Sequence, residues 1–158
     1  MDTDRKLTRR ELVGRAAGLA IPTILPSGII PMRGRQSPND RIGIGVIGTG
    51  GMGTGHVAPD TVALCDVDEG HLANARKRVT QGEPFMTRDF RRVLERKDVD
   101  AVIIATPDHW HALMTVMACQ AGKHVMSEKP TAKTIAEGRA MVNAARKYNR
   151  VVQIHAQG

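Results

Sequence analysis

Aromatic residues and cysteines are scarce in this 158-residue chain, and each shortage argues against a class of function. One Trp, one Tyr and two Phe make up 3% of the residues, too few for a surface on which nucleic-acid bases stack. The two cysteines, Cys65 and Cys119, fall in a predicted strand and a predicted helix, where we expect buried free thiols. Two separate cysteines form neither a disulfide framework nor a zinc site.

Acidic residues are outnumbered, but the positive excess is unevenly distributed along the chain. The net charge is +7. Residues 1–41 contain eight Lys and Arg against four Asp and Glu, whereas residues 42–158 contain fifteen against twelve. More than half of the excess therefore precedes residue 42, and no basic helix follows it. We expect no nucleic acid among the partners of this protein.

A long hydrophobic run is also missing. The uncharged stretch over residues 16–32 contains three prolines and two glycines, which make it too short and too broken for a stable membrane span. It follows Thr8-Arg9-Arg10-Glu11-Leu12, which resembles a twin-arginine export signal. We predict a signal segment over residues 1–32, a polar linker over residues 33–40 and a periplasmic location. A disordered basic tail on a cytoplasmic protein is the alternative.

Predicted strands and helices alternate along the rest of the chain. We expect strands at residues 42–47, 61–65, 85–86, 101–105, 124–127 and 151–154. Helices are expected from Gly51 and over residues 69–79, 89–96, 109–121 and 134–148. This order predicts an α/β domain over residues 41–158, built on a doubly wound parallel sheet of the Rossmann type.

The first predicted strand leads into a G-x-G-x-x-G pattern made by Gly48, Gly50 and Gly53. Gly48 permits the tight turn, Gly50 lets a pyrophosphate approach the backbone, and Gly53 lets the next helix pack closely on the strand. Residues 54–60, with Pro59 among them, are all that separate this pattern from the second strand. The first helix therefore has room for two turns at most.

An acidic residue follows the second strand at the spacing expected for a ribose ligand. Asp66 lies eighteen residues after Gly48, where a carboxylate accepts hydrogen bonds from the adenosine ribose. The alternative is that Asp66 or Asp68 only caps the next helix, and Asp68 suits the cap better. A carboxylate at this position favours NAD(H) over NADP(H).

Two further polar segments follow strands, where the ligand crevice of a parallel sheet forms. The first is Thr106-Pro107-Asp108-His109-Trp110-His111, and the second is Ser127-Glu128-Lys129-Pro130. His109 and His111 would diverge within a helix and no third ligand is evident, so we expect no metal site there. Lys129 is placed to hydrogen-bond a substrate hydroxyl and assist its proton transfer.

Taken in order, the segments GVIGTGGMGTG, ALCDVD, DAVIIATPDHWHA, AGKHVMSEKP and VVQIHAQG resemble the nucleotide-binding half of the Gfo/Idh/MocA oxidoreductases. The resemblance covers about residues 40–158 and implies NAD as cofactor. It implies Lys129 as the catalytic lysine and a cis Lys129–Pro130 bond. The residues that it places around the dinucleotide are Gly48, Gly50, Met52, Gly53, Asp66, Thr106, Pro107, His109, His111, Glu128 and Lys129.

The resemblance also implies a function and its limits. Members of the family continue into a second α/β domain with the substrate pocket, an acid/base histidine and an oligomerisation sheet. The sequence stops at Gly158, so we expect that domain to be absent and a homo-oligomer to form only where it is present. The implied activity is NAD-dependent oxidation of a sugar or polyol. The alternatives are an NAD-dependent glycoside hydrolase of the same family, acting on N-acetylgalactosaminides, and a nucleotide-binding module without turnover.

Overall fold

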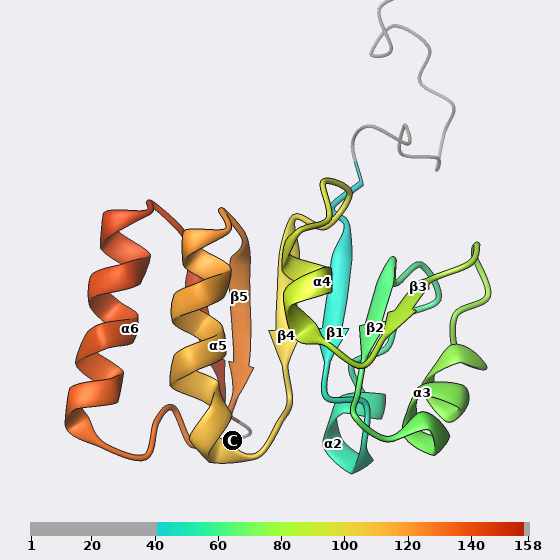
Figure 1. The fold of residues 1–158 in the computed structure, drawn as a ribbon, viewed down its shortest axis with the longest axis horizontal. Helices are drawn as coiled ribbons and strands as arrows, with labels where there is room; N and C mark the ends of the chain where they lie inside the picture. The colour runs from blue at the N-terminus through green and yellow to red at the C-terminus, as the bar shows by residue number, and fades with distance from the viewer. Residues whose placement is uncertain (1–40, 157–158) are drawn as a thin grey trace, which may run out of the picture. The chain divides into compact units, whose positions relative to one another are not determined.

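Six parallel strands form one sheet in the computed structural model, which describes residues 41–156 (Figure 1). The strands are β1 (Ile44–Ile47), β2 (Ala63–Cys65), β3 (Phe85–Thr87), β4 (Ala101–Ile104), β5 (His124–Glu128) and β6 (Val152–His155). Their order in the sheet is β3-β2-β1-β4-β5-β6. The predicted fold class is confirmed, because this is the order of doubly wound dinucleotide-binding sheets. The predicted signal segment and linker lie outside the described residues.

The helices alternate with the strands as the sequence predicts, with ends that differ by a few residues. They are α2 (Gly51–Thr54), α3 (Glu69–Arg76), α4 (Phe90–Leu94), α5 (Asp108–Gln120) and α6 (Ile135–Lys147). The helix α3 ends before the predicted residue 79. After it, the N–H groups of Arg78 and Val79 donate to carbonyl groups three residues back, so residues 77–79 form a tighter turn. No helix in the described part of the chain has the length and apolar character that a membrane crossing requires.

Side-chain and glycine caps fix the ends of three helices. Asp68 caps α3 by accepting a hydrogen bond from the N–H of His71, which confirms the role expected for it. Thr134 and Glu137 form the predicted capping box at the start of α6. After α5, Gly122 has a φ of +77°, a left-handed conformation that glycine adopts readily.

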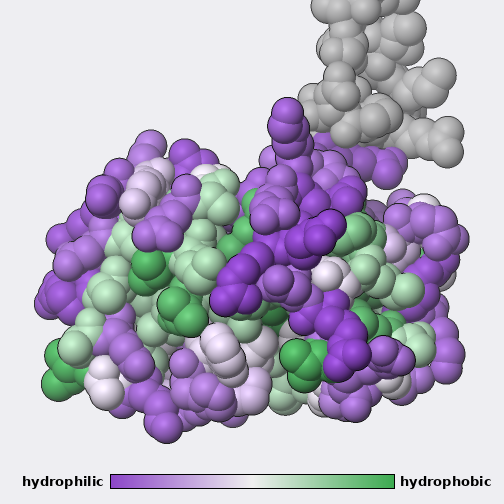
Figure 2. All heavy atoms as spheres, in the orientation of Figure 1, coloured by the Kyte–Doolittle hydropathy of each residue, from purple (hydrophilic) through white to green (hydrophobic). Residues whose placement is uncertain are grey.

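Two hydrophobic clusters cover opposite faces of the sheet. Neighbouring residues of β1 point to opposite faces, so Ile47 belongs to one cluster and Val46 to the other. The first cluster joins β1, β4 and β5 to α4, α5 and α6, and Figure 1 shows α5 and α6 on the near side of the sheet. The second cluster joins β1 and β2 to α3 and the segment around Val57. Figure 2 shows that the near face is mostly hydrophilic, with apolar patches between the charged side chains.

Both cysteines lie in the first cluster as free, buried thiols, as predicted. Burial, followed by the nearby carboxylates of Asp66 and Asp89, raises the pKa of Cys65 to about 12. Burial also raises the pKa of Cys119. Neither thiol is therefore ionised at neutral pH, and neither is a candidate nucleophile.

The first helix is as short as the sequence predicts, and it packs against the backbone of the turn before it. An added Cβ on Gly53 would overlap the carbonyl oxygen of Gly48 and come within 3.2 Å of the Cβ of Ala105. A Cβ on Gly51, two residues earlier in α2, would meet nothing within 4 Å. Of the two glycines in α2, Gly53 is therefore the one that its surroundings require to be glycine.

We expect Gly53→Ala to lower the free energy of unfolding by about 1–3 kcal/mol, because backbone must move to admit the methyl group. The matched variant Gly51→Ala should change stability by less than about 0.5 kcal/mol. Urea denaturation followed by far-UV circular dichroism measures both values. Equal stabilities of the two variants would contradict the close packing of α2 on the turn.

Candidate functional site

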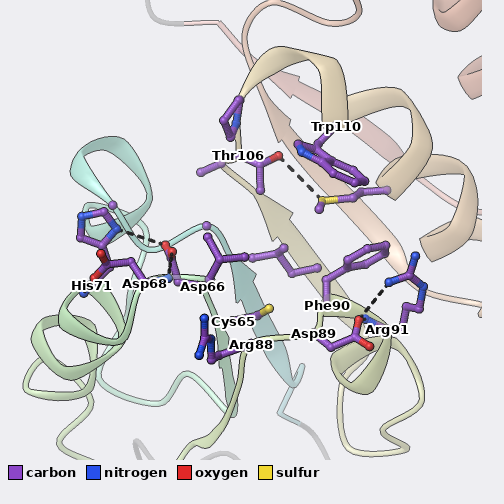
Figure 3. Close-up of a pocket in the computed structure, with 17 residues that line it drawn as sticks. Cys65, Asp66, Asp68, His71, Arg88, Asp89, Phe90, Arg91, Thr106 and Trp110 are labelled. Atoms are coloured by element: carbon purple, nitrogen blue, oxygen red, sulfur yellow. Dashed lines mark hydrogen bonds and ion pairs between the residues drawn. The ribbon is translucent and has the colours of Figure 1, made fainter.

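A cleft of about 550 Å³ opens at the carboxyl ends of β1, β2 and β4 (Figure 3). The order of the strands reverses between β1 and β4, and ligands bind to doubly wound sheets at this kind of position. The volume of the cleft lies within the range of roughly 300–1,000 Å³ that is usual for small-molecule and cofactor sites. The turn with Gly48 and Gly50 lines the cleft, and so do Thr106 and Pro107, which follow β4.

The glycine turn is tied to the ends of two neighbouring strands. Gly48 has a φ of +86°, and a side chain there would strike the carbonyl group of Ala105 at the end of β4. Its N–H donates to the carbonyl oxygen of Cys65 at 2.7 Å. Gly48 and Gly50 both line the cleft. Gly53 is buried beneath the turn and Met52 is half exposed on α2.

Asp66 lies where the sequence places it, at the end of β2 and in the wall of the cleft (Figure 3). One carboxylate oxygen accepts the N–H of Thr49 at 2.7 Å, and the other accepts the N–H of Asp68 at 3.0 Å. The side chain is 10% exposed. These backbone donors orient the carboxylate. A carboxylate oxygen can accept two hydrogen bonds, so the group retains capacity for a ligand hydroxyl.

One end of the cleft carries polar side chains, and the other carries two aromatic rings beside the Asp89–Arg91 ion pair. Figure 3 shows Asp66, Asp68 and His71 at one end, and Phe90 and Trp110 at the other. The ring centroids of Phe90 and Trp110 are 6.5 Å apart, and the two ring planes make an angle of 59°. This combination suits a dinucleotide, because its ribose hydroxyls donate hydrogen bonds to acceptors and its adenine ring packs against apolar and aromatic side chains.

The two histidines of the segment after β4 point in different directions. His109 is exposed at the start of α5, whereas His111 is 1% exposed beneath the same helix. Thr106 and Pro107 line the cleft, but neither histidine ring does. The cofactor contacts implied for His109 and His111 therefore stay predictions, and the structure gives His111 a different set of partners.

His111 connects the loop after β4 to the loop after β5. Its Nε2 lies 2.8 Å from the carbonyl oxygen of Thr106, and its Nδ1 lies 2.7 Å from that of Pro130. Both carbonyl groups are satisfied together only when each ring nitrogen carries a proton. The peptide bond between Lys129 and Pro130 is cis, as the family resemblance implies.

Glu128, which the family resemblance places near the dinucleotide, contacts two histidines that no sequence pattern marks, and its contact with the cofactor stays a prediction. One carboxylate oxygen lies 2.7 Å from Nε2 of His56 and 2.9 Å from Nδ1 of His155. The other accepts the N–H of Lys129 at 3.2 Å. Burial alone raises the pKa of the Glu128 carboxyl, but the hydrogen bonds from His56, His155 and the Lys129 N–H outweigh it and hold the pKa below its ordinary value.

Lys129 is exposed at the carboxyl end of β5, between two anchored neighbours. Glu128 is held through its side chain and Pro130 through its carbonyl oxygen. The backbone of Lys129 is therefore fixed on both sides while its side chain remains accessible. This arrangement suits a lysine that meets a substrate.

The strand order, the glycine turn and the acidic residue after β2 define a Rossmann-type dinucleotide-binding domain. Residues 42–156 match the family model described as "Oxidoreductase family, NAD-binding Rossmann fold". The chain belongs to this family, the Gfo/Idh/MocA oxidoreductases, as the sequence segments indicate.

Similar proteins include both dehydrogenases and a glycosyl hydrolase family. A glycosyl hydrolase family 109 protein of Shewanella pealeana is 32% identical over 89% of this chain and 37% of its own length. A levoglucosan dehydrogenase of Pseudarthrobacter phenanthrenivorans is 32% identical over 68% of this chain and 31% of its own. The solved scyllo-inositol dehydrogenase of Lactobacillus casei, with bound NAD(H) and scyllo-inositol, is 28% identical over 72% of this chain and 35% of that one, with a TM-score of 0.65. This chain spans about a third of the length of these relatives.

We expect His111→Leu to destabilise the domain, since it leaves the carbonyl groups of Thr106 and Pro130 without their partner. Each buried polar group left unpaired costs about 1–3 kcal/mol. His109→Leu, on the exposed side of the same helix, should change the free energy of unfolding by less than about 0.5 kcal/mol. Chemical denaturation distinguishes the two variants, and similar losses in both would rule out the bridging role of His111.

Proposed function

We propose that this chain is the cofactor-binding part of an NAD-dependent oxidoreductase that acts on a sugar or polyol. The observation that carries the proposal is the oriented carboxylate of Asp66 beside the glycine turn, at the switch point of the sheet. Family membership supports it, as do relatives whose names specify dehydrogenation of levoglucosan and scyllo-inositol. Because the chain spans about a third of these relatives, the activity of the whole protein is part of the proposal.

The residues around the cleft fit a dinucleotide. Gly48 and Gly50 leave the backbone open to a pyrophosphate, and Asp66 would hold the adenosine ribose. Phe90 and Trp110 offer the apolar wall that an adenine ring requires. When bound, the nicotinamide supplies the hydride acceptor.

Lys129 would act on the proton of the substrate. Its exposed side chain on an anchored backbone can hydrogen-bond the hydroxyl group that is oxidised and take up its proton. Glu128 and Pro130 hold the lysine in position, and neither exchanges a proton with the substrate in this scheme. Positioning of the substrate against the cofactor, which can be worth about 7–11 kcal/mol, would come from walls beyond the residues that line this cleft.

A second candidate function is an NAD-dependent glycoside hydrolase. The relative that covers 89% of this chain is named a glycosyl hydrolase family 109 protein, which favours this alternative. The two candidates differ in their net reaction, because a dehydrogenase releases NADH and a hydrolase of this type does not. For either function we also propose export through the twin-arginine route, on the sequence pattern at Arg9 and Arg10.

We expect the chain to bind NAD(H) more tightly than NADP(H), since the Asp66 carboxylate repels a 2′-phosphate. The preference should be about tenfold or more, which corresponds to roughly 1.4 kcal/mol. Asp66→Ala should reduce this preference. Asp98→Asn should leave it unchanged, because that carboxylate is exposed outside the cleft. Calorimetric titration with both dinucleotides measures the ratio of the two dissociation constants for each variant. Equal affinity of the unaltered chain for both would refute the role of Asp66.

We expect the 158-residue chain to bind cofactor without oxidising sugars, and a version extended by any downstream coding sequence to form NADH from a sugar or polyol. In the extended version Lys129→Ala should lower the rate by roughly 10²–10⁴-fold. Lys133→Ala, an exposed lysine nearby, serves as the control. Cleavage of glycosides without net formation of NADH would favour the hydrolase. Strong turnover by the 158 residues alone would show that no residues beyond them are needed to position the substrate.

A further inference from the structure

Three side chains with metal-ligating atoms converge at the carboxyl ends of β5 and β6, outside the cleft described above. They are His56, Glu128 and His155, and one ligand atom from each lies within 4.8 Å of the other two. The His56 and His155 rings meet edge to face, with centroids 5.0 Å apart. The function proposed above makes no use of either histidine.

The fold brings these residues together from three separate segments. Glu128 and His155 are partners in the parallel register of β5 and β6, so their side chains leave the sheet on the same face. His56 arrives from the segment that follows α2, because that helix ends at Thr54 and the chain turns at once. The shortness of α2 therefore determines where His56 lies.

Two imidazole nitrogens and one carboxylate oxygen form a donor set that zinc uses in catalytic sites, with a further position open. The Glu128 carboxylate is already oriented, since its second oxygen accepts the N–H of Lys129. Glu128 is almost fully buried, whereas the His155 side chain is 33% exposed. The cluster is thus closed on the side of β5 and accessible beside His155.

We propose that His56, Glu128 and His155 bind a divalent transition-metal ion such as Zn²⁺, with the remaining position open to water or to an oxygen atom of a small ligand. Lys129 follows Glu128 directly, so an ion at this site lies close to the lysine assigned to the substrate. No assignment of the catalytic lysine or of the dinucleotide cleft depends on this proposal.

The geometry requires a small adjustment. Ligand atoms about 2.0–2.1 Å from a tetrahedral ion lie roughly 3.3 Å from one another. The two nitrogens are 2.7 and 2.9 Å from the shared oxygen, so they must move outward by about half an ångström. On binding, each nitrogen gives its lone pair to the ion in place of a hydrogen bond to Glu128. In the hydrogen-bonded cluster the nitrogen that faces Glu128 carries a proton, because a carboxylate only accepts, so this proton must leave when the ion binds. In a neutral ring it passes through solvent to the other nitrogen, and the ring stays neutral.

The competing metal ligands in this chain are few. Residues 1–40 contain neither histidine nor cysteine. Both cysteines are buried as thiols, and the other four histidines are separate from the cluster within the described residues: His71, His109, His111 and His124. A variant at an exposed histidine outside the cluster therefore provides a direct control, and His109 is one.

The test is equilibrium dialysis of the chelator-treated 158-residue chain against Zn²⁺, with bound metal measured by mass spectrometry. We expect about one bound ion per chain, and its loss in His56→Ala, Glu128→Gln and His155→Ala but not in His109→Ala. Thermal denaturation with and without Zn²⁺ gives a second readout, since a ligand that binds the folded state raises the melting temperature. The cluster variants should lose that shift and His109→Ala should keep it.

Cobalt provides a measurement that needs no variant. Co²⁺ in a four-coordinate nitrogen and oxygen site absorbs visible light far more strongly than the hexaaqua ion, so the unaltered chain should become coloured on titration. Absence of both bound zinc and the cobalt spectrum would overturn the proposal and leave a hydrogen-bonded cluster. Retention of zinc by all three cluster variants, or its loss in His109→Ala as well, would overturn it by assigning the ion to other residues.

Discussion

The close contact between the backbone of Gly53 and that of Gly48 is the constraint on which the rest of the site depends. Since no side chain fits between them, α2 packs directly on the turn. The helix ends after four residues, because few residues remain before β2. The same turn brings the N–H of Thr49 to Asp66, which fixes the acidic wall of the cleft. The early end of α2 brings His56 to Glu128, on the other side of β1. The turn and the short helix that follows it thus each supply a partner to a carboxylate.

Histidines hold the backbone on both sides of Lys129. His56 and His155 bond to the side chain of Glu128, and His111 bonds to the carbonyl oxygen of Pro130. Each of these contacts joins β5 or its loop to a different part of the chain. A lysine has a long and flexible side chain, so anchoring its backbone is the part of preorganisation that the protein scaffold can supply. The position of the Lys129 ammonium group therefore depends on the molecule that binds beside it.

Most of the architecture could be predicted because it depends on local patterns. The strands and helices follow from apolar periodicity, the caps at Asp68 and Thr134 from their spacing, and the short α2 from the few residues before β2. The side-chain partners could not be predicted in this way. The meeting of Glu128 and His155 depends on strand register, and that of His56 depends on how α2 ends.

The two histidines after β4 show the same limit within one segment. Their spacing predicts that they diverge on a helix, and they do. The spacing does not say which of them is buried, because that depends on the packing of α5 against the sheet. His111 faces inward and makes two contacts with backbone carbonyl groups, one in each of two loops. A polar residue in a ligand-binding segment can therefore also hold the loops of that site together.

The polar residues of β5 and β6 mark this half of the sheet as different from the other half. Strands of a parallel sheet that are covered on both faces are nearly continuous apolar runs, and β4 has this character. In β5 and β6, Glu128 and His155 share one face, and a carboxylate among apolar neighbours would be costly there. Three hydrogen-bond donors offset that cost at Glu128. The second hydrophobic cluster is built on β1, β2 and α3, with Ile103 of β4 at its margin. Where that cluster ends, the same face of the sheet carries ionisable groups, which is where chemistry can be placed without disrupting the core.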